Sequence, residues 1–289
     1  MTTKKIELVI APPTPHFVGD GFRVHNFIPS AYHLDMERMS PFIMLDYNSK
    51  HFFAPTDIPR GVGVHPHRGF ETVTIAYNGK VEHHDSAGGG GVIGEGDVQW
   101  MTAASGVLHK EFHETEWAKE GGIFQMVQLW VNLPKKDKMS NPKYQAIKNS
   151  EMTKVDLGEN GFIEVIAGDY NGNKGPAFTF SPVKMMNAKL KTGGKAEFNF
   201  PAHYNTALVI IEGNVKVNGE TVATDHFVLF ENEGETFTIE ATEDAIVLVL
   251  SGEPINEPIV AHGPFVMNTR EEIIQAFNDV NLGKFGYLE

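Results

Sequence analysis

Two short stretches decide the interpretation of this chain: His65-Pro66-His67-Arg68-Gly69-Phe70-Glu71 and His109-Lys110-Glu111. Side chains two residues apart point to the same face of a β-strand, so His65 and His67 project together if their segment is extended. Pro66 favours the extended form, because the residue before a proline is pushed out of the helical region. The same spacing separates His109 from Glu111. Two such strands would direct three imidazoles and one carboxylate at one point, which suits a divalent transition metal with open positions for substrate.

A single His-x-His pair more often marks surface or hydrogen-bonded histidines than a metal site. Here the spacing occurs twice, and glycines precede each pair. This recurrence favours the metal interpretation over the surface one. We therefore predict that one metal ion is held by His65, His67, His109 and Glu111.

Composition limits the class of protein. A chain of 289 residues is long for one domain and predicts two. It contains no cysteine, which excludes disulfides, thiolate ligands and a cysteine nucleophile. The formal net charge of −13 repels nucleic-acid phosphates and anionic lipid. No stretch has the length of a membrane span, and the apolar run near the N-terminus is too short for a signal peptide. We expect a cytoplasmic protein that binds neither nucleic acid nor membrane.

The second half of the chain repeats the first. Residues 204–215 align without gaps on residues 70–81, and the strand, the turn glycine and the following valine all match. Short strands separated by turn signals such as Asn78-Gly79 and Asn218-Gly219 indicate an antiparallel sandwich or barrel in each half. An internal repeat of this size predicts two copies of one domain.

The predicted division falls after residue 134. Residues 1–134 form an N-terminal metal-binding domain, and residues 135–289 form a metal-free C-terminal domain that includes a linker and a C-terminal helix. In the linker, the basic cluster at 135–138 is interpreted as a solvated connection, and a short helix fits at 143–148. The C-terminal helix is predicted from a capping box, an apolar stripe and a terminating glycine, namely Thr269 with Glu272, then Ile273, Ile274 and Phe277, then Gly283.

The repeat also provides a control for the metal interpretation. Extending the alignment places Asn199, Pro201, Phe237 and Ile239 opposite His65, His67, His109 and Glu111. All four ligand types are absent from the second copy, while its apolar strand pattern persists. Residues that served only the fold would have less reason to be lost as a set. We therefore expect one metal per chain, in the N-terminal domain.

Long runs of this sequence resemble the pirin family of cupin proteins. The resemblance covers nearly the whole chain in the family's order, and it is carried by residues 63–72 (first cupin motif in its pirin form), 96–103 and 106–111 (second motif), 129–133 and 262–269 (further pirin signatures). It implies an all-β fold of two tandem cupin-type antiparallel β-barrels, a bicupin, with a C-terminal α-helix and metal in the N-terminal barrel only.

The resemblance also assigns individual residues. It implies the same four metal ligands: His65, His67, His109 and Glu111. Glu71 occupies the carboxylate position of the general cupin motif, but pirins take their carboxylate from the second motif, so Glu71 is expected to pack or hydrogen-bond. Lys110 is expected to point away from the metal. Three further histidines are interpreted as surface or supporting residues rather than ligands, namely His83, His84 and His113.

Bacterial pirins include flavonol 2,4-dioxygenases, the quercetinases, so the resemblance implies this activity. The implied cofactor is one divalent transition metal per chain, iron in the family, although nickel, manganese, cobalt, copper and zinc accept the same ligands. The metal would act as a Lewis acid toward the acidic enol of a flavonol. Glu111 would be the catalytic residue that accepts the enol proton. Reaction with O2 would then open the heterocyclic ring and release carbon monoxide.

An alternative function remains open at this stage. Pirins also act as metal-dependent interaction proteins, so the chain could instead be a redox-sensing regulator that binds a transcription factor or a metabolic enzyme. A scaffold with a vestigial metal site is a third alternative. We expect a monomer in each case.

Overall fold

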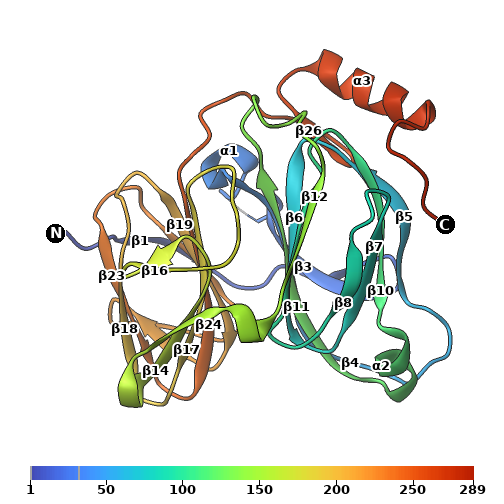
Figure 1. The fold of residues 1–289 in the computed structure, drawn as a ribbon. Helices are drawn as coiled ribbons and strands as arrows, with labels where there is room; N and C mark the ends of the chain where they lie inside the picture. The colour runs from blue at the N-terminus through green and yellow to red at the C-terminus, as the bar shows by residue number, and fades with distance from the viewer. Residues whose placement is uncertain (1, 32) are drawn as a thin grey trace. The chain divides into compact units, whose positions relative to one another are not determined.

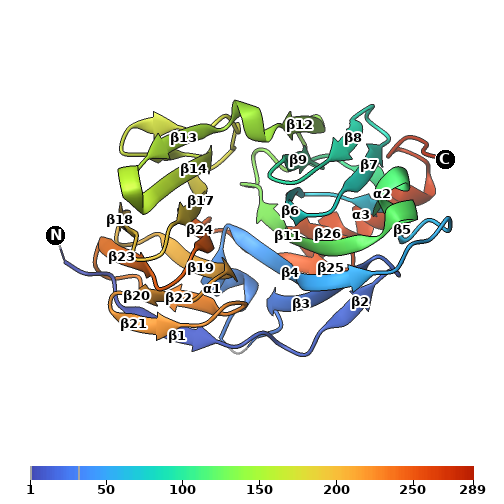
Figure 2. The same ribbon diagram turned by 90° about the horizontal axis from the view of Figure 1, so that it is seen from below.

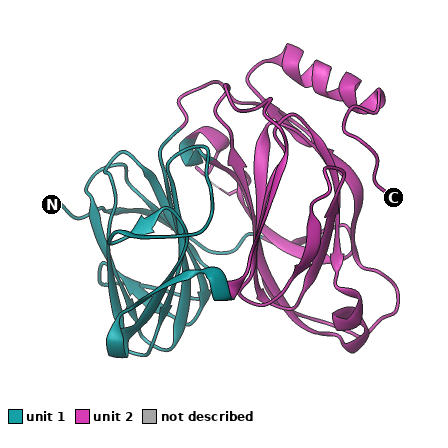
Figure 3. Cartoon of the chain, in the orientation of Figure 1, with its two compact units in different colours: residues 1–13, 38–41, 150–254 teal, residues 14–37, 42–149, 255–289 magenta. Residues whose placement is uncertain are grey.

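The computed structural model describes residues 2–31 and 33–289, and its elements are mainly β-strands (Figure 1). None of its described helices is both long enough and apolar enough to span a membrane. Contacts divide the chain into two compact units, coloured separately in Figure 3. Unit 1 contains residues 1–13, 38–41 and 150–254, and unit 2 contains residues 14–37, 42–149 and 255–289.

Unit 2 contains one sheet of seven strands and one of four. The seven-stranded sheet, in spatial order, is β12 (Lys143–Ile147), β9 (Val98–Thr102), β6 (Phe70–Asn78), β11 (Gly122–Asn132), β4 (Phe42–Phe53), β3 (Phe22–Ile28) and β2 (His16–Val18). The four-stranded sheet is β5 (Gly61–His67), β10 (Val107–His113), β7 (Val81–Asp85) and β8 (Gly90–Ile93). The remaining elements are helix α2 (Thr115–Glu120), the hairpin of β25 (Val260–His262) and β26 (Phe265–Met267), and helix α3 (Arg270–Asn281).

Unit 1 has the same two sheets. Its seven-stranded sheet is β1 (Ile6–Ile10), β22 (Phe227–Phe230), β19 (Asn205–Glu212), β24 (Ala245–Gly252), β17 (Val183–Leu190), β14 (Gly161–Ala167) and β13 (Thr153–Asp156). Its four-stranded sheet is β18 (Lys195–Asn199), β23 (Thr236–Ala241), β20 (Val215–Val217) and β21 (Glu220–Val222). Its short elements are the pair β15 (Asp169–Tyr170) and β16 (Asn173–Lys174) and the 3-10 turn η2 (Gly158–Asn160). The residues of helix α1 (Met36–Met39) and of the 3-10 turn η1 (Asn149–Glu151) are divided between the two units.

The shared topology confirms the predicted all-β fold of two cupin-type domains. Strand β19 occupies in unit 1 the position that β6 occupies in unit 2, as the alignment of residues 204–215 with 70–81 predicts. The sheets do not close into complete barrels. Each unit is instead a sandwich of a seven-stranded and a four-stranded sheet.

The unit boundaries differ from the division predicted after residue 134. Strand β12 pairs with β9, so residues 143–147 extend the sheet of unit 2 and are a strand where a short helix was considered. Strand β1 pairs with β22 and completes the sheet of unit 1 (Figure 2). Each seven-stranded sheet therefore takes one edge strand from across the predicted boundary. Edge pairing of this kind depends on tertiary contacts that a local sequence pattern does not encode.

Helix α3 begins with the predicted capping box. The hydroxyl of Thr269 accepts from the Glu272 backbone N–H at 3.2 Å, and the Glu272 carboxylate accepts from the Thr269 N–H at 3.0 Å. The predicted apolar stripe was only partly right, because Ile274 is 61% exposed and Phe277 is 39% exposed. The buried positions are Ile273, Ala276 and Asp279. The helix packs beside β26 within unit 2 (Figure 1).

Asp279 turns inward because Arg68 is its partner. The two side chains form an ion pair at 2.9 Å and are almost completely buried. The guanidinium of Arg68 also lies 4.6 Å from the centroid of the Phe285 ring. The ion pair of Arg68 with Asp279 fixes the C-terminal helix to the residue that directly follows His67.

Lys138 is buried, so the interpretation of the 135–138 cluster as solvated is wrong for this residue, whereas Lys135 and Lys136 are exposed. The Lys138 amine donates to the Gly69 carbonyl at 2.7 Å, to the Asn132 side-chain oxygen at 2.6 Å and to the Val266 carbonyl at 2.9 Å. Burial lowers the pKa of Lys138 to about 7, but three oxygen acceptors match the three N–H donors of the charged form. Lys138 therefore joins three separate segments of unit 2.

Replacing Lys138 by Met should destabilise the fold. The substitution preserves most of the side-chain volume but leaves three buried acceptors without their donor, so we expect the free energy of unfolding to fall by about 3 kcal/mol. Urea unfolding measures this change. Lys136→Met is the matched control, because Lys136 is exposed, and it should change stability by less than about 0.5 kcal/mol. Equal stability of the two variants would contradict the assignment.

Candidate metal centre

Strands β5 and β10 bring three histidines together. The strands are antiparallel, with His65 paired to His109 and His67 paired to Val107. Ring centroids are separated by 4.1 Å between His65 and His109, 4.7 Å between His67 and His109, and 4.9 Å between His65 and His67. One ligand atom from each ring lies within 4.8 Å of the others. The geometry is therefore compatible with one ion bound by all three.

Glu111 follows His109 by two residues and faces the same interior. The register shifts by one residue between them, so Glu111 lies opposite Val62. Ligand atoms of Glu111, His109 and His83 form a second group within 4.8 Å. The intervening Lys110 points away, as predicted, and its amine contacts the terminal residue Glu289. The structure thus places all four predicted ligands, which we call the ligand group, on the adjacent strands β5 and β10. His83 lies beside them on β7.

The hydrogen bonds of the histidines fit metal ligation. His65 Nδ1 lies 2.8 Å from the Gly63 carbonyl, and His67 Nδ1 lies 3.3 Å from the Pro264 carbonyl. A carbonyl only accepts, so each Nδ1 donates and each Nε2 retains its lone pair. Nε2 of His109 is buried without a hydrogen-bond partner. Metal-bound histidines commonly donate their other N–H to a backbone carbonyl in this way.

Burial and neighbouring side chains together set the protonation states of His67, His109 and Glu111. It lowers the pKa of His67 to about 3, with a further contribution from His65, and it lowers the pKa of His109 well below the usual value. Burial opposes ionisation of Glu111, but contacts from His83 and Gln128 outweigh it and lower the pKa of this carboxyl. Neutral imidazoles and an ionised carboxylate are the forms that bind a metal ion.

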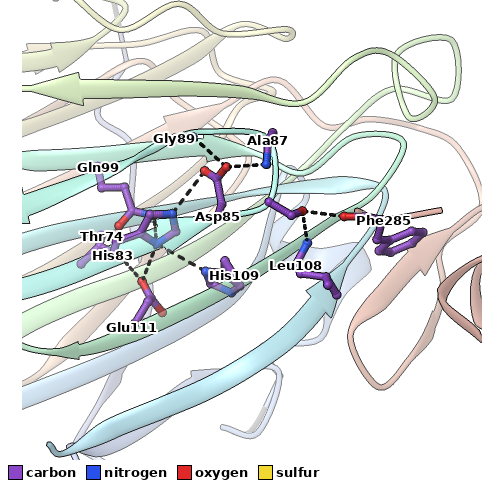
Figure 4. Close-up of polar contacts among 11 residues, drawn as sticks. Thr74, His83, Asp85, Ala87, Gly89, Gln99, Leu108, His109, Glu111 and Phe285 are labelled. Carbon is purple, nitrogen blue, oxygen red and sulfur yellow. Dashed lines mark hydrogen bonds and ion pairs between the residues drawn. The ribbon is translucent and has the colours of Figure 1, made fainter. Parts of the chain in front are cut away.

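His83 is a site residue for which the sequence interpretation left both a surface and a supporting role open. It is completely buried beside the predicted ligands, and its ring stacks on Tyr144 with centroids 5.3 Å apart. Figure 4 shows its side chain directed toward Asp85, His109 and Glu111. Burial opposes its protonation, but Asp85 and Glu111 together raise its pKa. Alternation along β7 is the signal that could have placed it inward, because Val81, His83 and Asp85 are all buried.

The other two histidines are not in the ligand group. His84 is exposed and lies 3.0 Å from the Glu82 carboxylate. His113 is buried, but its Nε2 lies 2.8 Å from the Gly21 carbonyl and its ring packs against Phe53 and Phe124. Glu71 accepts a hydrogen bond from Thr102 at 2.7 Å, in line with the structural role expected for it.

A row of polar side chains crosses the larger sheet beside the metal ligands. Backbone pairing aligns one residue from each of five neighbouring strands, namely Asn26, Asp46, Gln128, Thr74 and Gln99. Gln128 donates to Glu111 Oε2 at 2.9 Å, and Thr74 donates to Oε1 at 3.5 Å. The amide nitrogen of Gln99 lies 3.2 Å from His83 Nδ1 (Figure 4). Three members of the row, Gln128, Thr74 and Gln99, therefore hold Glu111 and His83 in position from the facing sheet.

The ligand group opens on a cavity of about 310 Å³. Its polar lining consists of His65, His67, Glu111, Gln128 and Asp46, and its apolar lining consists of Val18, Phe22, Val24, Met44, Val62, Met126 and Trp130. This volume is at the lower end of the range for small-molecule sites. A mainly apolar pocket with polar groups at one wall suits a compact aromatic ligand.

Unit 1 has phenylalanines where unit 2 has the histidines. Phe198 pairs with Phe237 as His65 pairs with His109, and Phe200 accompanies Glu235 as His67 accompanies Val107. The rings of Phe198 and Phe237 stack at 5.0 Å, and all three phenylalanines are buried. The gapless alignment was wrong by one residue here, because it placed Asn199 and Pro201 at these positions. Phe200 precedes Tyr204 by four positions, whereas His67 precedes Phe70 by three, so unit 1 has one additional residue here.

Comparison with known proteins agrees with this organisation. The Pirin family model matches residues 21–131, and the model described as the Pirin C-terminal cupin domain matches residues 185–286. A relative from Pseudomonas aeruginosa, provisionally named a quercetin 2,3-dioxygenase, is 46% identical over 98% of both chains. A pirin-like protein of Caulobacter vibrioides is 37% identical over 97% of this chain and 98% of its own. The crystal structure of a quercetin 2,3-dioxygenase from Acinetobacter baumannii superposes with a TM-score of 0.92 and is 49% identical in sequence. The match covers 99% of this chain and 100% of that chain.

Alanine substitution tests the ligand assignment. We expect His65→Ala, His67→Ala and His109→Ala each to lose most of the bound metal while staying folded, because other apolar clusters hold unit 2. Elemental analysis and circular dichroism measure the two properties. His84→Ala is the matched control, since His84 is on a neighbouring strand but exposed, and it should retain wild-type metal content. Full metal content in any two of the three ligand variants would refute the assignment.

Metal stoichiometry tests the difference between the units. We expect one ion per chain, because phenylalanine and isoleucine at the corresponding positions of unit 1 offer no ligand atoms. Elemental analysis combined with quantitative amino-acid analysis gives the ratio. Two well-occupied sites per chain would contradict the expectation.

Proposed function

The chain belongs to the pirin family, and on this premise we propose that it is a metal-dependent dioxygenase that opens the heterocyclic ring of a flavonol such as quercetin. The observation that carries the proposal is that His65, His67 and His109 form one group beside an apolar cavity, while Glu111 lines the same cavity and groups with His109 and His83. The quercetin 2,3-dioxygenase name of the Acinetobacter structure, at 49% identity, supports it.

His65, His67, His109 and Glu111 would hold one divalent ion, and we propose iron. Neutral imidazoles and a single carboxylate leave the centre with a net positive charge. When bound, the ion would supply a Lewis acid that favours the ionised form of an acidic enol. This charge complements a flavonol, whose enol hydroxyl lies beside a carbonyl.

Glu111 is the residue that we propose accepts the enol proton. Its lowered pKa keeps the carboxylate ionised and able to accept at neutral pH. Gln128 and Thr74 hold its two oxygens, so the carboxylate is oriented before the substrate enters. Overall, O2 contributes both atoms to the ring-opened product, and one ring carbon leaves as carbon monoxide.

The apolar residues of the cavity would bind the aromatic body. Trp130 is held in position by stacking on Phe70, with ring centroids 4.2 Å apart. Together with Met44 and Met126 it provides a wall that excludes water from the reacting ring. The acidic chain also favours a neutral aromatic substrate over a phosphorylated one.

The experiment that tests the function is an aerobic assay of quercetin absorbance. The protein is loaded separately with iron, nickel, manganese, cobalt and copper, and we expect oxygen-dependent loss of the flavonol with at least one of them. If no loaded form consumes quercetin, the enzymatic proposal fails and the alternative of a metal-dependent regulatory protein takes its place.

The substitution Glu111→Gln separates the proposed role of Glu111 as a proton acceptor from its proposed role as a metal ligand. Glutamine keeps the size and a weakly coordinating oxygen but cannot accept the proton, so activity per bound metal should fall by a factor of about 10²–10⁴. Metal content should fall much less. Glu71→Gln is the matched control, since it alters a buried carboxyl that bonds Thr102 away from the ligand group, and it should keep near-wild-type activity per metal. Unchanged activity per metal in Glu111→Gln would mean that the proton is accepted elsewhere.

A further inference from the structure

We propose that Asp46 recognises a hydroxyl group of the substrate, and that the site therefore selects polyhydroxylated aromatic molecules over those that carry only the reacting enol. The inference rests on the proposed function and names the substrate class of the same cavity. It depends on what the polar groups of the cavity already bind and on the position of Asp46 among them.

Asp46 is the polar residue of the cavity that has no other assigned role. Among the described residues that line the cavity, His65, His67 and Glu111 belong to the ligand group, and Gln128 holds Glu111. The other lining residues are apolar except for the indole N–H of Trp130, which is a donor and cannot accept from a hydroxyl. A carboxyl group in such a wall is costly unless something donates to it.

The carboxyl group of Asp46 can accept more hydrogen bonds than it receives from the protein. Its Oδ1 accepts from the Asn26 side-chain amide at 2.7 Å, and Asn26 also donates to the Ile28 carbonyl at 3.0 Å. No ion pair joins it to a cation in the described part of the chain. Burial raises the pKa of Asp46, and the contributions of Asn26 and His16 reverse this only in part. Two carboxylate oxygens can accept about four hydrogen bonds, so a ligand hydroxyl would fill a vacant position.

Strand register places Asp46 at a distance from the proposed metal ligands that one planar molecule can span. Asp46 pairs with Gln128 across β4 and β11, and Gln128 contacts Glu111. Neighbouring strands are about 4.8 Å apart, so Asp46 lies roughly one strand spacing beyond Gln128. Met44 precedes Asp46 by two residues on the same face of β4, and the apolar wall continues there. A planar molecule with its enol at the ligand group can thus present a second hydroxyl to Asp46.

A buried acceptor discriminates strongly because it penalises ligands without a donor. Binding of such a ligand removes water from Asp46 and leaves its oxygen unpaired. A hydrogen bond to a charged group of this kind corresponds to about a tenfold or larger difference in Kd between the two ligands.

Two flavonols test the inference. Quercetin and 3-hydroxyflavone share the enol and carbonyl, but 3-hydroxyflavone lacks all other hydroxyls. We measure the Kd of each by calorimetry on the metal-loaded protein without oxygen, so that no turnover occurs. The wild type should bind quercetin at least about tenfold more tightly. In Asp46→Leu this ratio should approach one, and in Asp46→Asn it should be intermediate, because the amide oxygen still accepts.

Controls separate the role of Asp46 from effects on folding and on the metal. Met126→Leu changes the cavity wall without a polar group, so the wild-type ratio should persist. Metal content and the unfolding midpoint are measured for each variant, and Asp46→Asn, which is nearly isosteric, decides the test if Asp46→Leu does not fold. A wild-type ratio in the folded Asp46 variants would overturn the inference.

The outcomes distinguish the inference from the proposed function. If the wild type consumes a flavonol in air while the Asp46 variants keep the wild-type ratio, the function stands and the inference fails. If flavonols bind with the expected ratios but none is consumed, the function fails and the recognition role stands. If neither flavonol binds, both are overturned.

Discussion

The antiparallel pairing of β5 with β10 is the constraint on which the candidate metal centre depends. It sets His65 opposite His109 and leaves Glu111 on the same interior face. A slip of one residue in β10 would turn both His109 and Glu111 outward and bring Lys110 inward. The pairing is secured on both sides, because β10 also pairs with β7, where Glu111 lies opposite His83. The ligand group therefore forms only when β10 pairs in the correct register.

The C-terminal segment of unit 2 supports this pairing from outside the sheets. The Pro264 carbonyl accepts from His67, which fixes the orientation of one proposed ligand. Arg68 pairs with Asp279 of helix α3, and Lys138 joins the backbones of Gly69 and Val266. These buried charges are costly to desolvate, but each has hydrogen-bonding partners, so removing one partner would leave the other uncompensated. The segment directly after the His-x-His pair is therefore held by residues that are distant in sequence.

The sequence predicted the features that follow from a local period and missed those that depend on partners across strands. Spacing of two was sufficient to predict that His65 and His67 lie close to His109 and that Glu111 faces the same interior, and the repeat was sufficient to predict two similar domains. The role of His83 could not be decided between surface and supporting residue, because it depends on lying opposite Glu111. The polar row was missed for the same reason, since its members come from five separate strands. The exchange of edge strands β1 and β12, and the burial of Lys138, likewise follow from tertiary pairing.

The two units differ in what occupies the positions of the histidines between their sheets. In unit 1, three phenylalanines occupy the histidine positions and join a continuous buried cluster with Phe230, whose ring lies 4.5 Å from that of Phe237. Their volume fills the space between the sheets, and close packing of this kind is what stabilises most protein interiors. Imidazoles are smaller and need partners for their nitrogens, so the same fold with histidines leaves space and requires a polar surrounding. In unit 2 backbone carbonyls are the partners of His65 and His67, Gln128 of the polar row donates to Glu111, and the cavity extends from these residues to Asp46. Replacement of an apolar centre by a polar one therefore creates both the ligand group and the space beside it.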